Sequence, residues 1–148
     1  MATRTRRLSP KKILLGTALL LVAMQLVPYG RAHTNPPLVA EPAWDKPAVR
    51  ELVKQACFDC HSNETRWPAY ASLAPSSWLV QNDVDGGRAH LNFSEWQRPQ
   101  RHAKDAAEQV RSKEMPPWYY TMLHPPARLS DADRAGLAIA FEKMFGTK

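Results

Sequence analysis

The sequence predicts an all-α protein, in which one N-terminal transmembrane helix precedes a small helical domain. Between Val49 and Ala56, apolar residues recur at i, i+3, i+4 and i+7, the spacing of a helix with one buried face. No stretch keeps the alternation of apolar and polar residues that a half-buried strand requires. An almost uninterrupted apolar run precedes this domain, and 148 residues suffice for one small domain with an extension.

The N-terminal region has the charge pattern of a membrane-inserted segment. Residues 1–12 form a basic head, and residues 13–28 form an apolar stretch that we interpret as a membrane anchor or signal segment. Arg31 interrupts the small residues that could serve as a cleavage site, so we favour an uncleaved transmembrane helix. The head then stays in the cytoplasm, and the rest of the chain lies in the periplasm or another extracytoplasmic space.

The net charge of +6 comes from this same region. Arg31 and the basic head hold six of the 20 Lys and Arg residues, and the remaining 14 equal the 14 Asp and Glu. The body of the chain is therefore neutral. A basic head before an apolar run indicates membrane topology, so we expect no nucleic-acid partner.

A proline-rich segment separates the apolar stretch from the folded domain. Residues 29–46 are predicted to form an extended, semi-stiff tether, because their prolines prevent a regular helix. The folded domain then occupies residues 47–148. Its first helix begins at Pro47, which suits a first helical turn, and is expected to run through Cys57.

Two further helices are predicted in the middle of the domain. The first begins at Ser76 and ends at the pair Gly86-Gly87, since glycine commonly terminates helices. Ser94 is expected to cap the second, in a capping box with the glutamine three residues later. This helix stops before Met115, because the proline that follows disfavours helical backbone there.

The last helix has clear signals at both ends. Ser130 suits its N-cap, with two aspartates in the first turn, and Gly146 suits its C-terminus. We expect its core face to consist of Leu137, Ile139, Ala140, Met144 and Phe145.

The two cysteines of the chain lie in one pentapeptide, C-x-x-C-H. Cys57 and Cys60 share a helical face, and His61, one position later, lies on the same side. Two thiols and an imidazole in this register suit a porphyrin with two vinyl groups and an open iron position. The motif therefore indicates covalent attachment of haem c, with His61 as the proximal iron ligand.

Three alternatives to haem attachment each lack a required part. A zinc site needs four ligands, and no second cysteine pair follows the first. A thioredoxin-like redox pair needs a βαβ context, which the chain lacks. A structural disulfide does not call for a histidine after the second cysteine. The remaining histidines have no zinc-finger spacing: His33, His90, His102 and His124.

Met115 is our candidate for the second axial ligand of the iron. Its thioether is a soft ligand, and Pro116 and Pro117 fix the backbone behind it. A methionine that only fills a gap in the core is the alternative. His124, before two prolines, competes as the distal ligand or as a hydrogen-bond partner of a haem propionate. Two other histidines are expected to be solvated surface residues, His90 and His102.

Residues 57–97 and 115–130 resemble the bacterial haem-binding domain family. The resemblance covers most of the domain and implies an all-helical fold similar to cytochrome c, with one covalently held haem. At residue 69 the chain has alanine, where members often have a large aromatic residue. Three family motifs, Met-Pro-Pro, His-Pro and Asn-Phe-Ser, correspond to Met115–Pro117, His124–Pro125 and Asn92–Ser94.

We therefore expect a membrane-tethered electron carrier with one haem c per chain and His61 and Met115 as axial ligands. With both axial positions filled, the iron exchanges electrons with a redox partner protein, which the sequence does not identify, and performs no catalysis. The alternative is a haem-based sensor or a peroxidase-like enzyme, whose sixth iron position would be open or exchangeable.

Overall fold

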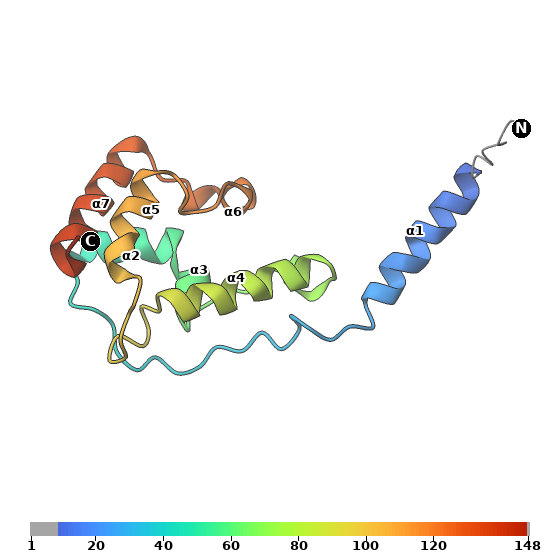
Figure 1. The fold of residues 1–148 in the computed structure, drawn as a ribbon, viewed down its shortest axis with the longest axis horizontal. Coiled ribbons are helices and arrows are strands. Elements are labelled where there is room, and N and C mark those ends of the chain that lie inside the picture. Colours follow the sequence, from blue (N-terminus) through green and yellow to red (C-terminus); the bar gives the residue numbers. More distant parts are fainter. Residues whose placement is uncertain (1–8, 148) are drawn as a thin grey trace, which may run out of the picture. The chain divides into compact units, whose positions relative to one another are not determined.

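The computed structural model describes residues 9–147, and the chain divides into two compact units. Unit 1 combines the described part of Met1–His33 with Pro68–Gln81, and unit 2 combines Thr34–Trp67 with the described part of Asn82–Lys148. The described residues form helices and loops and no strand (Figure 1). The prediction of an all-α protein is thus confirmed.

The predicted transmembrane helix is wrong. The apolar run forms helix α1, Pro10–Met24, which is only 15 residues long. At 1.5 Å per residue it measures about 22 Å, shorter than the ~30 Å hydrocarbon core of a bilayer. Within residues 9–147, no helix has both the length and the apolar character needed to cross a membrane. The predicted basic head, residues 1–12, falls mostly outside the described residues.

Gln25 explains why α1 ends before the apolar run does. Its side-chain amide donates to the carbonyl oxygens of Leu21 and Ala74, each at 2.9 Å, and accepts from the Ala74 amide at 3.0 Å. Because this polar side chain binds backbone groups of unit 1, the helix stops at Met24 and a turn follows. The 3₁₀ helix η1, Ala69–Ser72, belongs to the same unit.

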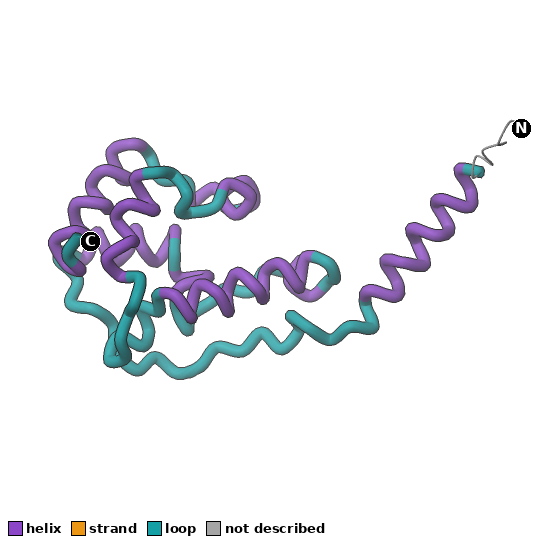
Figure 2. Tube along the Cα trace, viewed as in Figure 1, coloured by secondary structure: helices purple, strands orange, loops and turns teal. Residues whose placement is uncertain are grey.

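The second half of the proline-rich segment lies along unit 2 as a loop (teal in Figure 2). Ala40 forms an isolated parallel bridge with Glu95. Trp44 packs against Phe93 and Phe58, with ring centroids 5.5 Å and 6.3 Å apart. Residues 34–46 are extended, as the prolines predict, and their backbone and side chains are fixed on the helical domain.

Two helices meet at the cysteine motif. Helix α2, Pro47–Ala56, begins at the predicted proline, and the short helix α3, Phe58–His61, follows directly. The prediction of one helix running through Cys57 is wrong, because the backbone of this residue leaves helical geometry at φ −128° and ψ −31°. The predicted stripe is confirmed: its members are buried or packed against the core, namely Val49, Leu52, Val53 and Ala56.

Helix α4, Ser76–His90, begins where predicted and continues past the glycine pair that was expected to end it. Gly86 and Gly87 have no left-handed backbone, which is the feature that terminates helices at glycine. The role of Gly87 is instead to let the helix approach α3, as its surroundings in the functional site show.

Ser94 does not cap a helix, and that prediction is wrong. Its hydroxyl accepts a hydrogen bond from the amide of Asn63 at 2.9 Å, and its own amide donates to the Asn92 side chain at 2.9 Å. Asn92 in turn donates to the side chain of Asn63 at 2.9 Å. All three residues are buried, so the Asn-Phe-Ser motif ties the loop after α4 to the loop after α3.

The core of unit 2 lies between α2, α5 and α7. The 3₁₀ helix η2, Ala103–Asp105, leads into α5, Ala106–Arg111, which packs beside α7, Asp131–Phe145 (Figure 1). The apolar side chains of η2 and α5 are buried here, namely Ala103, Ala106, Ala107 and Val110. Aromatic rings complete the core, with Phe93 stacked on Phe58 at 5.8 Å and on Phe141 at 6.2 Å.

Helix α7 has the predicted ends but a rotated core face. Ser130 accepts a hydrogen bond from the amide of Asp133 at 3.0 Å, and Gly146 follows the last turn with φ +79°. Ile139, however, is 62% exposed, so its predicted place in the core is wrong. Packing against α5 and α2 turns another arc of the helix inward, and its buried members are Leu137, Ala138, Ala140 and Phe141.

One more helix, α6, Trp118–Leu123, was not predicted from the sequence. It follows the Met-Pro-Pro motif and leads through His124 into the 3₁₀ helix η3, Pro125–Ala127. Six residues between prolines give too short a pattern to establish a helical period.

Candidate functional site

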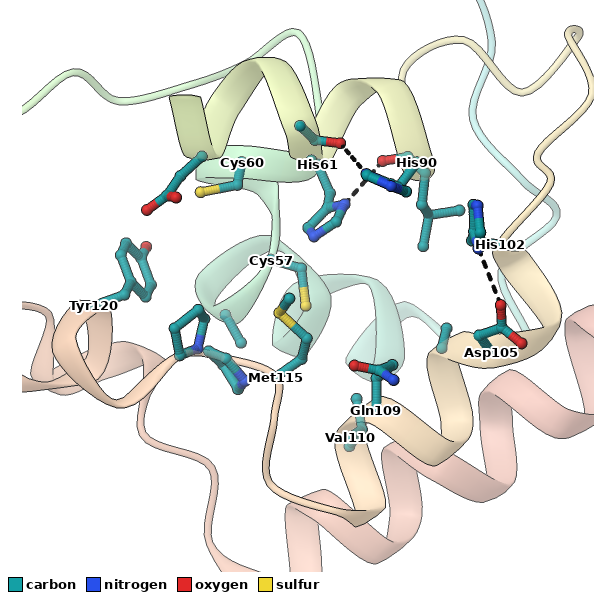
Figure 3. A pocket seen from close by; sticks show the side chains of 18 of the residues that line it. Cys57, Cys60, His61, His90, His102, Asp105, Gln109, Val110, Met115 and Tyr120 are labelled. Carbon is teal, nitrogen blue, oxygen red and sulfur yellow. Dashed lines mark hydrogen bonds and ion pairs between the residues drawn. The ribbon is translucent and has the colours of Figure 1, made fainter. Parts of the chain in front are cut away.

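The cysteine motif forms one wall of a cavity of about 510 Å³ in unit 2 (Figure 3). The carbonyl oxygen of Cys57 accepts hydrogen bonds from the amides of Cys60 at 3.1 Å and His61 at 2.8 Å. This single turn brings both thiols and the imidazole to the same cavity wall, as their spacing predicts.

His61 is held with one ring nitrogen toward the protein and the other available to the cavity. Its Nδ1 lies 2.9 Å from the carbonyl oxygen of Leu91, to which it donates as the Nδ1–H tautomer. Burial lowers the pKa of His61, against the opposing effect of this carbonyl, and so favours the neutral ring. A neutral imidazole with Nδ1 bound to a carbonyl presents the lone pair of Nε2, as iron-ligating histidines do.

Both cysteines are free thiols with suppressed ionisation. Burial raises the pKa of Cys57 to about 12 and is the main reason that the pKa of Cys60 also rises to about 12. The carboxylates of Asp83 and Asp59 raise the pKa of Cys60 further. At neutral pH the thiols are therefore protonated and shielded from unselective oxidation or alkylation.

The glycine pair of α4 lets this helix pack onto the turn formed by residues 57–61, which carries both cysteines and His61 and is called the attachment turn below. A Cβ atom at Gly87 would lie 2.8 Å from the carbonyl carbon of Cys60 and 3.1 Å from its Cβ. A Cβ atom at Gly86, which also lines the cavity, would meet nothing within 4 Å. The two glycines thus allow close helix packing and keep the cavity wall free of side chains.

Met115 stands across the cavity from His61 in Figure 3, with its side chain pointing inward. Its amide donates to the carbonyl oxygen of Gln109 at 2.9 Å, and its carbonyl accepts from Arg134 at 2.9 Å. Its peptide bond to Pro116 is cis. The two hydrogen bonds hold the backbone of Met115 on both sides, and its thioether points into the cavity.

His124 does not line the cavity. Its ring stacks on Tyr120, with centroids 4.2 Å apart, and its Nδ1 lies 3.0 Å from the Tyr120 carbonyl oxygen. The structure therefore brings Met115 to the same cavity as Cys57, Cys60 and His61, and leaves His124 behind the tyrosine.

Two tyrosines of α6 line the cavity and were missed by the sequence analysis. Tyr119 donates to Asp83 of α4 at 3.1 Å, and Tyr120 donates to Asp59 of α3 at 2.7 Å. Arg66 also binds Asp59, at 3.2 Å. These bonds hold α6 at one end of the cavity. The sequence gives little sign of the two tyrosine bonds, because Tyr119 lies 36 positions from Asp83 and Tyr120 lies 61 positions from Asp59.

The other end of the cavity is lined by His90, His102, Asp105 and Gln109. His90 and His102 are exposed to solvent, as expected for surface residues, but they also belong to the cavity wall. Nothing in the local sequence around either histidine indicates that the fold brings them together.

The residues of the cavity fit a haem. The volume lies within the ~300–1,000 Å³ typical of ligand sites. The fit also rests on chemistry: two thiols one turn apart, an imidazole with its Nε2 free, a thioether and an otherwise largely apolar wall. Within residues 9–147, no group of three or more His, Cys, Asp or Glu side chains is arranged to hold a metal ion by itself.

Comparison with known proteins agrees with this geometry. The chain matches the family described as haem-binding domain over residues 19–142, which include every residue of the cavity. No curated protein and no solved structure matches the chain.

Proposed function

The chain belongs to the haem-binding domain family, and on this premise we propose that it carries one haem c, attached covalently through Cys57 and Cys60. The attachment turn supports the covalent mode most directly. Both thiols and His61 occupy a single helical turn on one cavity wall, and the hydrogen bond from His61 Nδ1 to Leu91 leaves Nε2 free for the iron.

We further propose that Met115 provides the sixth ligand and that the domain transfers electrons to a partner protein. When bound, the haem supplies an iron that alternates between the ferrous and ferric states. The chain contributes a soft thioether opposite the imidazole, which favours the reduced state, and a backbone that holds the sulfur in place. Pro116 and Pro117 also line the cavity and help to exclude water from it.

We propose that the domain functions outside the bacterial cytoplasm. Basic residues precede the apolar helix α1, the order found in segments that direct export. Covalent attachment of haem c takes place on an exported, unfolded apoprotein. Cell fractionation of a haem-loaded, tagged chain tests this proposal, and recovery of the holoprotein from the cytoplasm alone would contradict it.

Extraction of the pigment tests covalent attachment. The full chain is expressed with a cytochrome c maturation system and treated with acidified acetone, and pyridine haemochrome spectra are recorded. The colour should stay with the wild-type protein and with the control His124→Ala. It should be lost from the variant that carries Cys57→Ala and Cys60→Ala together. Free extraction of haem from the wild type would refute the proposal.

A further inference from the structure

The cavity is poor in groups that can neutralise an anion. Its lining includes no lysine or arginine among the described residues. Among the described residues that line it, the side chains that can carry a positive charge are three histidines: His61, His90 and His102. Because His61 is half-buried and its Nδ1 is bound to Leu91, an anionic ligand group has His90 and His102 as its remaining cationic partners.

These two histidines come from different elements and meet at the cavity. His90 ends α4, and His102 precedes η2, yet their ring centroids lie 4.9 Å apart at an angle of 63°. The Nδ1 of His90 lies 2.7 Å from the carbonyl oxygen of Gly86, and that of His102 lies 3.0 Å from Asp105 Oδ2. Both rings are thus fixed through Nδ1, which leaves the two Nε2 atoms for a ligand.

Haem carries two carboxylates, on the ring edge opposite its two vinyl groups. If Cys57 and Cys60 hold the vinyl edge, the carboxylates point away from them. Figure 3 shows Cys60 and Tyr120 on the left of the cavity and His102 and Asp105 on the right, with His61 between. At the α6 end, Asp83 accepts a hydrogen bond from Tyr119 and offers a propionate no donor, whereas the other end offers two imidazoles.

We propose that His90 and His102 bind the haem propionates through their Nε2 atoms, and that Asp105 positions the His102 ring. The proposal rests on the haem attachment proposed above. The Asp105 carboxylate is itself bound to His102, so its negative charge is engaged with the ring that it orients. Both histidines are exposed, which suits propionates that remain partly hydrated at the mouth of the cavity.

Selective labelling of the propionates tests this site in the full holoprotein. Cells that depend on added 5-aminolevulinate, labelled with ¹³C at its carboxyl carbon, place the label only in the two propionate carboxyls of the haem. The ferrous protein, diamagnetic with histidine and methionine ligands, then gives two carboxyl resonances. If Met115 does not bind, carbon monoxide restores the diamagnetic state.

We expect His90→Ala and His102→Ala each to shift at least one propionate resonance, and the double variant to shift both. Asp105→Asn should shift the resonance that His102→Ala shifts. His102→Gln, which keeps an N–H donor, should restore part of that shift. The reduction potential should fall in the double variant, because loss of the donors leaves more negative charge beside the iron.

His124→Ala is the matched control, since His124 lies outside the cavity, and it should shift neither resonance. Propionate resonances that stay unchanged in both His90→Ala and His102→Ala would overturn the proposal, as would equal shifts in His124→Ala. A protein without any bound label would instead refute the haem attachment itself. The two failures are therefore distinguishable.

Discussion

Gly87 packs directly against the backbone of Cys60, so closely that a Cβ atom at Gly87 would lie 2.8 Å from the Cys60 carbonyl carbon. The contact joins the second half of α4 to the turn that carries both cysteines and His61. It explains why a glycine pair occurs within a helix, where glycine costs about 0.5–1 kcal/mol relative to alanine. The position of the attachment turn depends on this missing side chain.

Gly87→Ala should therefore destabilise the protein, although alanine is the better helix former. We expect a loss of about 1–3 kcal/mol in the free energy of unfolding, because the carbonyl of Cys60 cannot move without displacing α3. Denaturant unfolding followed by circular dichroism measures this loss. Gly136→Ala in α7 is the matched control, since its Cβ would meet nothing within 4 Å and should stabilise by up to about 1 kcal/mol. Equal stability of Gly87→Ala and wild type would show that the helices separate easily.

The thiols of the haem-free protein should react slowly with alkylating agents. A pKa of about 12 leaves far less thiolate at pH 8 than an ordinary cysteine has. Since each pKa unit changes the thiolate fraction tenfold, we expect iodoacetamide to react more than about 100-fold slower in the folded than in the unfolded protein. The folded rate should still rise above pH 9, where the unfolded rate levels off. Mass spectrometry of quenched samples gives both rates, and similar folded and unfolded rates at pH 8 would contradict the raised pKa of the thiols.

Met115→Ala should remove the spectroscopic signs of sulfur ligation from the holoprotein. We expect the weak band at the red end of the ferric spectrum to disappear and the reduction potential to fall, because a soft ligand favours ferrous iron. Spectra and redox titration of the purified protein measure both changes. Met122→Ala is the control, since Met122 is 57% exposed and lies outside the cavity.

Two results would change the assignment of the sixth ligand. A band that survives Met115→Ala but vanishes in Met122→Ala would move the ligand to Met122 and keep the electron-transfer function. A high-spin ferric wild type would remove methionine ligation altogether. The sensor or peroxidase-like interpretation would then replace that of an electron carrier.

Asn92→Ala should destabilise the fold without touching the proposed haem ligands His61 and Met115. The side chain of Asn92 donates to Asn63 and accepts from the amide of Ser94, and all three groups are buried. Truncation leaves at least one buried polar group without its partner, which costs about 1–3 kcal/mol. Thermal and denaturant unfolding measure the loss. Ser112→Ala, at the exposed end of α5, should change stability by less than about 0.5 kcal/mol. A neutral effect of Asn92→Ala would mean that water replaces the lost bonds.

The sequence by itself determined the local features of the fold. The attachment turn, the start of α2 at Pro47 and the capped ends of α7 all depend on hydrogen bonds and backbone limits within a few residues. Such features are readable because neighbouring residues in the chain are also neighbours in space. Met115 was predicted as a ligand on a local feature too, since the two prolines that follow it limit its backbone, and the structure places it at the cavity.

Only the tertiary structure decided the features that join distant segments. The glycine pair ends no helix, because close packing on Cys60 and not a left-handed turn requires Gly87. His90 and His102 become ring neighbours, and Ser94 binds Asn63 instead of capping a helix. The apolar run failed as a transmembrane helix because its helix stops at Met24, where Gln25 binds the backbone of a residue 49 positions away. Each outcome was set by a partner that no local pattern identifies.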